Sequence, residues 1–322
     1  MILVFFSLVM SAGAKKEDKA EIRVPQPKGN LRYSITVTRF ENKANWRGQF
    51  DVGHGFSEML TDALKQSDWF VVLGEQEMRI EAMQEQDFVD SGRVARGKKA
   101  PKKGRLTPAE LLVKGAITHV QHSTTGGSGG IGFKGFRIGG KTDHAEINMT
   151  LYLVDSETGQ VKASTNVIGK SGRKGLGIGY HGNKLSGLTG DLAGFKKDNV
   201  GKACQDAVDQ AVVFLINQLE DISWQGTILL VKDDKIIMNR GSREGVAPGD
   251  RFEVGGVEEL VDPDTGEVLD VDLTTAGIVE AEQVKEKITY LKPLEGCGEI
   301  KKDMTARPIY NKKPKTQTDK QD

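Results

Sequence analysis

A run of alternating residues followed by a tight turn constrains this fold more than any other stretch. From Ala145 to Val154, apolar side chains alternate with polar ones, the period of two that predicts a strand with one buried face. Asp155–Gly159 predicts a hairpin turn with its glycine at positive φ, and Gln160–Ile168 then pairs back. Leu111–Val120 is apolar and β-branched, which predicts a third, buried strand. We therefore expect a sheet built around this hairpin.

Two glycine-rich inserts, residues 126–141 and 169–195, flank the hairpin. Glycine inside a strand costs stability unless the backbone bulges or approaches a neighbour closely. Apolar residues alternate with glycine in the second insert, and the first recovers such a pattern after a one-residue slip near Gly135. Two interpretations stay open: membrane-spanning β-hairpins or long glycine loops. For the hairpins, the side chains expected to face lipid are Ile131, Phe133, Phe136, Ile138, Leu176, Ile178 and Tyr180.

Two segments of the first insert match nucleotide-binding motifs. Gly135–Thr142 fits G-x-x-x-x-G-K-T, and Gly127–Gly132 fits G-x-G-x-x-G. Both motifs need a following helix, because the phosphate binds at its N-terminus. A polar strand follows here instead, so we predict no nucleotide cofactor. No nucleophile–histidine–acid set or metal-ligand cluster stands out either, so we predict no catalytic residues, no metal and no enzyme.

The surrounding chain predicts an α+β domain over residues 31–222. Strands are expected at Leu31–Phe40 and Trp69–Leu73, and helices at Phe56–Lys65, Glu75–Val89 and Asn199–Leu219.

Two details of this domain are more specific. In the second helix, Met78, Met83 and Phe88 are expected in the core. Thr107–Glu110 has the spacing of a capping box, which predicts a short helical turn before the buried strand.

The charges balance, with 45 basic and 45 acidic residues, so there is no overall attraction to nucleic acid or membrane. One segment departs from this balance, because residues 93–105 are rich in lysine and arginine and contain no acid. We interpret it as a solvated loop. A contact with a polyanion is the alternative, but interleaved aromatic residues are absent, and we predict no nucleic-acid partner.

The N-terminal residues predict export. Met1–Met10 is apolar and Ala12-Gly13-Ala14 fits a cleavage site, so residues 1–14 are expected to be a signal peptide and 15–30 a polar linker. No lipid-bearing cysteine is expected at that cleavage point. Cys204 and Cys297 are expected to be separate structural cysteines, although an export compartment also permits a bridge between them.

From about Gly226 the pattern changes to short strands separated by turns, including Arg251–Val254 and Gly277–Val284. This spacing predicts a small all-β barrel or sandwich over residues 226–308. Residues 309–322 are charged and are expected to be a disordered tail.

Several segments together resemble the CsgG-like family of curli-secretion components, over Leu31–Leu219. They are Thr36–Phe40, Met59–Phe70, Val113–Ile117, Leu151–Gly159 and Val213–Asn217. The C-terminal region resembles the C-terminal domain of flagellar assembly protein T, at Asn239–Ser242, Gly245–Asp250 and Asp262–Leu269.

The first resemblance implies a ring-shaped homo-oligomer in which each protomer gives two β-hairpins to a shared outer-membrane barrel. Those hairpins fall at the two glycine-rich inserts. The family's channel constriction lies in the loop after the first strand, where Gln49 and Phe50 match two of its positions and Trp46 lies near the third. The insert residues Lys134, Arg137, Arg173 and Lys174 are basic and depart from the family pattern.

The resemblance therefore implies a non-enzymatic protein of the periplasm and outer membrane. It would be a secretion channel or assembly platform for curli-like or other surface-appendage subunits. The alternative is a soluble periplasmic scaffold for a surface or flagellar structure, without a pore.

Overall fold

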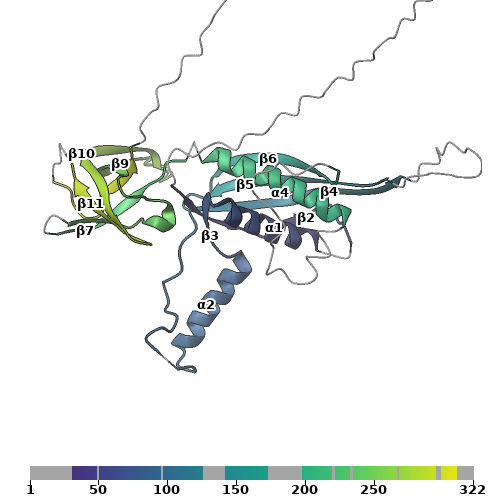
Figure 1. The fold of residues 1–322 in the computed structure, drawn as a ribbon, viewed down its shortest axis with the longest axis horizontal. Coiled ribbons are helices and arrows are strands. Elements are labelled where there is room, and N and C mark those ends of the chain that lie inside the picture. The colour runs from purple at the N-terminus through teal and green to yellow at the C-terminus, as the bar shows by residue number, and fades with distance from the viewer. Residues whose placement is uncertain are drawn as a thin grey trace, which may run out of the picture.

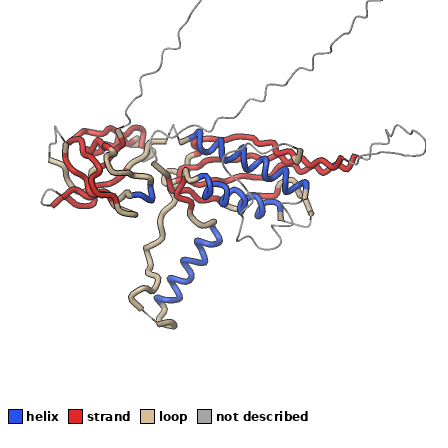
Figure 2. Tube along the Cα trace, in the orientation of Figure 1, coloured by secondary structure: helices blue, strands red, loops and turns tan. Residues whose placement is uncertain are grey.

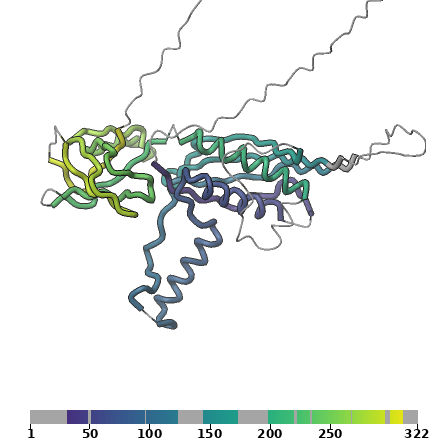
Figure 3. The backbone as a smooth tube through the Cα atoms, viewed as in Figure 1, coloured from purple at the N-terminus to yellow at the C-terminus, as the bar shows by residue number. Residues whose placement is uncertain are grey.

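The computed structural model describes residues 31–48, 51–95, 97–125, 142–172, 198–219, 222–232, 235–266, 268–294 and 299–309. The described chain forms a mixed α/β unit followed by a closed β-barrel (Figure 1). It passes once from the first unit to the second, as the colours in Figure 3 show. The prediction of a mixed chain with few helices and many strands in two sheets is confirmed.

The first sheet has the order β3-β1-β4-β5-β6, with β2 paired to β4. Its strands are β1 (Tyr33–Val37), β2 (Glu41–Asn42), β3 (Phe70–Val72), β4 (Leu111–Thr125), β5 (Thr142–Asp155) and β6 (Val161–Lys170). β1 is parallel to both β3 and β4, whereas β4, β5 and β6 form an antiparallel meander. The turn between β5 and β6 has Gly159 at φ 72°, as the sequence predicts.

Three helices belong to this unit: α1 (Val52–Ser67), α2 (Gln76–Asp90) and α4 (Asn199–Gln218). α4 packs on β5 and β6, α1 packs on β1 and β3, and α1 and α4 contact each other (Figure 2). The apolar side of β5 is buried beneath them, at Ala145, Ile147, Met149, Leu151 and Leu153. Its alternate residues Glu146, Asn148, Thr150 and Tyr152 are at least partly exposed. One face of the sheet is therefore covered, as the alternation predicts.

The interior position of Met78, Met83 and Phe88 is a wrong prediction. These side chains are 53%, 51% and 45% exposed, and α2 extends away from the sheet (Figure 1). The three residues are spaced five apart, and in an α-helix this spacing separates neighbours by about 140° around the axis. They therefore share no single face that the core could bury.

The helical turn expected at Thr107–Glu110 is absent; β4 follows directly. The Glu110 carboxylate does not cap a helix here. Its Oε2 accepts hydrogen bonds from Ser34 N at 2.7 Å and Ser34 Oγ at 2.9 Å, and its Oε1 lies 2.5 Å from Arg240 Nη2. The Glu110 carboxylate therefore bonds to β1 and to the C-terminal region, and it does not cap a helix as the local motif predicts.

The barrel closes in the order β10-β11-β8-β7-β12-β9. Its elements are β7 (Gly226–Lys232), β8 (Lys235–Met238), the short 3₁₀ helix η1 (Ser242–Glu244), β9 (Arg251–Val261), β10 (Val268–Val284), β11 (Thr289–Pro293) and β12 (Thr305–Pro308). Of the two predicted architectures, barrel or sandwich, the structure has the barrel. β9 and β10 are longer than the predicted strands. Independent folding of residues 226–308 stays a prediction.

Gly169, near the end of β6, allows the closest approach between the sheet and α4. A Cβ at this position would lie 2.0 Å from Ala203 O and 2.8 Å from Ala207 Cβ. Real Cβ atoms do not approach a backbone oxygen so closely, so a larger residue must separate β6 from α4.

We expect Gly169→Ala to lower the free energy of unfolding by about 1–3 kcal/mol, because overpacking forces the backbone to shift. Chemical denaturation measures this loss. Gly256→Ala is the matched control, since a Cβ at Gly256 meets nothing within 4 Å. Equal stability of the two variants would contradict the packing described here.

Candidate functional site

An antiparallel ladder between β4 and β5 extends to both edges of the first insert. β4 and β5 pair from Leu111 opposite Asp155 to Thr125 opposite Thr142, with one register shift between Ile117 and His119. Residues 126–141 lie outside the described part of the chain. The residues on either side of the insert, Thr125 and Thr142, are cross-strand partners, so the insert joins two strands that are paired up to its edges.

The second insert leaves the sheet beside the first. Lys170, the last residue of β6, pairs with Glu146 near the start of β5. Ser171 N then donates to Ala145 O at 2.9 Å, and Ala145 N donates to Ser171 Oγ at 2.9 Å. Gly169 and Lys170 therefore belong to the strand, and the predicted start of the insert at 169 is too early. Both inserts depart from the same end of the sheet.

Side chains of α4 hold this end of β6. Lys170 N donates to Asp206 Oδ2 at 2.9 Å, and Asp206 is buried. Gln210 Nε2 donates to Ile168 O at 3.0 Å and to Asp206 Oδ2 at 3.1 Å. The helix that follows the second insert is thus bonded to the strand that precedes it, which fixes both attachment points.

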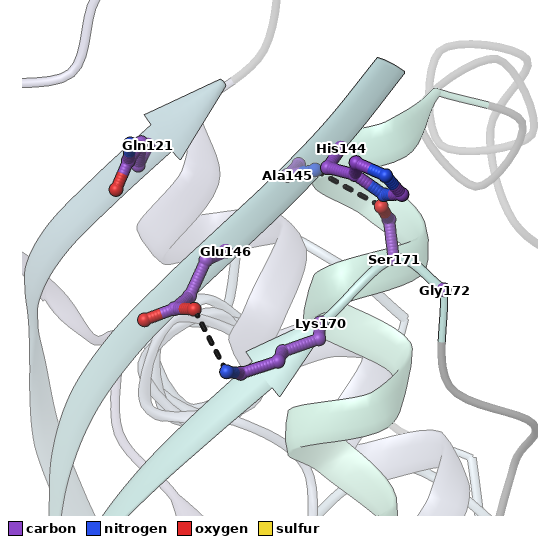
Figure 4. Close-up of a pocket in the computed structure, with 7 residues that line it drawn as sticks. All are labelled: Gln121, His144, Ala145, Glu146, Lys170, Ser171 and Gly172. Carbon is purple, nitrogen blue, oxygen red and sulfur yellow. Dashed lines mark hydrogen bonds and ion pairs between the residues drawn. The ribbon is translucent and has the colours of Figure 1, made fainter. Parts of the chain in front are cut away.

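A cavity of about 300 Å³ lies at these attachment points (Figure 4). Its lining residues are Gln121, His144, Ala145, Glu146, Lys170, Ser171 and Gly172. Lys170 Nζ lies 3.1 Å from Glu146 Oε2, so the two charged groups of the lining pair with each other. Ser171 Oγ accepts a hydrogen bond from Ala145 N at 2.9 Å. Sequence reasoning missed this cavity, because it combines three separate segments.

The loop after β1 carries the predicted constriction. Gln49 and Phe50 lie outside the described residues. Trp46 is partly buried and packs against the core. Asn42 Nδ2 donates to Trp46 O at 2.8 Å, and Trp46 N donates to Asn42 Oδ1 at 3.3 Å. The backbone of Trp46 is therefore held beside β2, and its side chain folds back onto the protein.

An ion pair joins the two ends of this loop. The Arg39 guanidinium, just before β2, contacts the carboxylate of Asp51, just before α1, and lies 3.5 Å from Glu77 Oε1. Asp51 Oδ1 also accepts from His54 N at 3.0 Å and caps α1. Burial would raise the pKa of Asp51, but the His54 amide and Arg39 outweigh it and lower that pKa below its ordinary value. The Arg39–Asp51 ion pair, called the loop clamp below, therefore holds the two ends of the loop together.

No helix in the described ranges is long and apolar enough to cross a membrane. No group of three or more histidine, cysteine or acidic residues in the same ranges is arranged to hold a metal. Cys204 is a buried free thiol whose pKa is raised by burial. Cys297 and all seven residues expected to face lipid, Ile131, Phe133, Phe136, Ile138, Leu176, Ile178 and Tyr180, lie outside the described part.

Relatives of known name share much of this chain. CsgG, the curli production assembly/transport component, is 28% identical in Salmonella typhimurium and in Escherichia coli K12, over 214 residues that cover 60% of this chain and 73% of each relative. The Citrobacter koseri protein is 26% identical over the same length.

Solved structures give weaker likenesses. The PelC dodecamer from Paraburkholderia phytofirmans is 16% identical with a TM-score of 0.25, covering 47% of this chain and 80% of that one. A lipoprotein from Neisseria meningitidis is 14% identical with a TM-score of 0.25, covering 59% and 99%. Both TM-scores indicate only weak structural similarity.

The match to a family model settles the family. Residues 17–239 match the model described as curli production assembly/transport component CsgG. The match ends just after β8, so the resemblance of the C-terminal region to flagellar assembly protein T stays a prediction. The chain belongs to the CsgG family.

Proposed function

We propose that this protein is a non-enzymatic component of the bacterial outer membrane, where it forms a ring. In this role it is a secretion channel or assembly platform for curli-like or other surface-appendage subunits. Membership of the CsgG family supports a role in assembly or transport. The observation that carries the proposal is the shared end of the sheet, where the ladders β4–β5 and β5–β6 bring the attachment points of both inserts together.

Chain length is compatible with this placement. A tilted transmembrane strand needs about 9–11 residues. The second insert is long enough for two such strands. The first insert reaches that length when the end residues of β4 and β5 are included. Those end residues are polar, as at Gln121, His122 and His144, so they would lie at the headgroup ends of the span or face the water-filled lumen.

The loop after β1 would then form the constriction of the channel. We assign Gln49 and Phe50 to its lining and give Trp46 a supporting role, because the Trp46 side chain packs against the core. The Arg39–Asp51 clamp would hold the loop at a fixed angle to the sheet. A narrow passage requires this rigidity, since a loop free at its base would vary in position from protomer to protomer.

A soluble periplasmic scaffold is the second candidate. The basic residues Lys134, Arg137, Arg173 and Lys174 within the inserts favour it, because charges that face lipid are costly. In the channel proposal these side chains must face the water-filled lumen, where they are tolerated.

Ile178→Arg and Phe133→Arg distinguish the two candidates. In a channel, each substitution puts a charge against lipid at a cost of about 2–4 kcal/mol per protomer near the bilayer midplane. We expect both variants to lose the membrane-bound oligomer, assayed by membrane flotation and native electrophoresis. Val161→Arg is the control, because Val161 is exposed at the opposite end of β6. Ile178→Arg protein that stays in the membrane as an oligomer would support the scaffold.

Asp51→Ala tests the loop clamp. Loss of the helix cap is expected to cost about 1 kcal/mol of unfolding free energy at pH 7. Because the pKa of Asp51 is lowered in the folded protein, this contribution is complete above the ordinary value of 3.8 and disappears as the pH falls below it.

Denaturation of wild type and variant at several pH values measures this difference. Asp62→Ala changes the same residue type within α1 without removing a cap, and its effect is expected to stay within about 0.5 kcal/mol. A difference between wild type and Asp51→Ala that persists unchanged to pH 2 would contradict the clamp.

A further inference from the structure

α2 and the segment that follows it form a projecting arm, defined here as residues 76–105. α2 has 15 residues, which gives a length of about 22 Å. It stands clear of the sheet in Figure 1 and exposes Met78, Met83 and Phe88. The segment after the helix exposes Lys98, Lys99 and Lys102. The arm therefore carries its positive charge on the segment after the helix, whereas the helix exposes apolar side chains together with the acids Glu77, Glu81 and Glu85.

The base of the arm is fixed. Thr36 Oγ1 donates to Gly74 O at 2.8 Å, and Arg79 Nη1 donates to Thr107 O at 3.1 Å. Lys103 Nζ lies 3.0 Å from Asp87 Oδ1 and 3.1 Å from Asp90 Oδ2, which folds the basic segment back to the end of α2. The arm is thus held in one direction, so a partner meets a formed surface.

A second surface projects from the barrel. Residues 257–261 of β9 and 268–273 of β10 pair with each other, whereas the pairing with β12 and β11 is confined to residues 252–255 and 279–284. This two-stranded ribbon leaves Leu260 63% and Leu269 58% exposed. An isolated two-stranded ribbon is only marginally stable in water. A partner that covers it would therefore stabilise it.

The ribbon has two chemically different faces, because directly paired residues point to the same side. Val257 pairs with Leu273, Glu259 with Val271 and Val261 with Val268, so one face is mainly aliphatic and carries a single acid, Glu259. Glu258 pairs with Asp272 on the other face, and Asp270 pairs with Leu260. From residue 252 to residue 284 the sequence contains acids but no lysine or arginine. Like charges placed opposite each other are destabilising, and a nearby cation would relieve that cost.

We propose that the arm of one copy of this chain binds the ribbon of the next copy. The lysines of the arm would lie against the face of the ribbon that carries Glu258, Asp270 and Asp272. In Figure 1 α2 projects downward from the first unit, whereas β9 and β10 lie in the barrel at the left, and no ion pair joins the described residues of arm and ribbon within one chain. Two different patches that meet head to tail generate a ring when the rotation closes. This inference rests on the proposed oligomer and adds the surfaces that build it.

Charge reversal tests the contact in the full chain. The arm variant carries Lys98→Glu, Lys99→Glu and Lys102→Glu, and the ribbon variant carries Glu258→Lys, Asp270→Lys and Asp272→Lys. Each variant alone places like charges together and is expected to lose at least tenfold in assembly affinity, measured by analytical ultracentrifugation in detergent. In an equimolar mixture, every contact between an arm variant and a ribbon variant has opposite charges, so we expect the two variants to assemble in alternation. Lys301→Glu with Lys302→Glu is the control outside both surfaces and should assemble as wild type does.

Three outcomes would overturn the inference. If wild type is oligomeric and each variant assembles equally well, the ring stands but its contacts lie elsewhere. If both variants are folded, as judged by circular dichroism, and their mixture still fails to assemble, the arm and the ribbon do not pair. If the arm variant assembles normally but loses binding to vesicles of anionic lipid, the arm contacts a membrane instead. A wild type that is monomeric at all concentrations would remove the proposed ring itself.

Discussion

The antiparallel ladder between β4 and β5 is the interaction on which the rest of the structure depends. It runs from Leu111 opposite Asp155 to Thr125 opposite Thr142, far beyond the five-residue strand β1 beside it. The apolar residues of β5 form the floor of the core, and α1 and α4 cover that floor. The same ladder places the attachment points of the first insert, Thr125 and Thr142, side by side at the end of the sheet. Without this pairing neither the core nor the attachment of the inserts would be defined.

Close packing then fixes the second insert. Gly169 lets α4 approach β6, and Asp206 accepts a hydrogen bond from the last strand residue, Lys170. The two attachment points therefore move with the sheet and helix as one unit. At the domain junction, Glu110 bonds Ser34 and Arg240, which links the first sheet to the barrel.

Elements with a strong periodic pattern were predictable from the sequence, whereas contacts between residues far apart in the chain were not. The apolar residues of β5 alternate along the strand, and those of α4 recur at helical spacing, so both patterns are local. These apolar residues are buried as expected. α2 shows what the sequence could not predict. Its sequence is helical but has no apolar stripe, and nothing in it indicates that the helix projects away from the sheet. Glu110 shows another limit, since its partners lie far away in the chain. The short strand β12, at Thr305–Pro308, carries too few residues for a periodic signal.

The candidate site was predictable only in part. The positions of the inserts followed from their glycine content, but the cavity beside His144 and Lys170 joins residues that only the folded sheet brings together. Trp46 could be placed in a loop from sequence, but its contact with the core depends on the turn formed with Asn42.

Membrane insertion is the central claim, and single-channel recording in planar lipid bilayers tests it most directly. Purified wild-type oligomer should give discrete, reproducible conductance steps. Protein that remains oligomeric but gives no conductance in bilayers would contradict the channel and leave the scaffold.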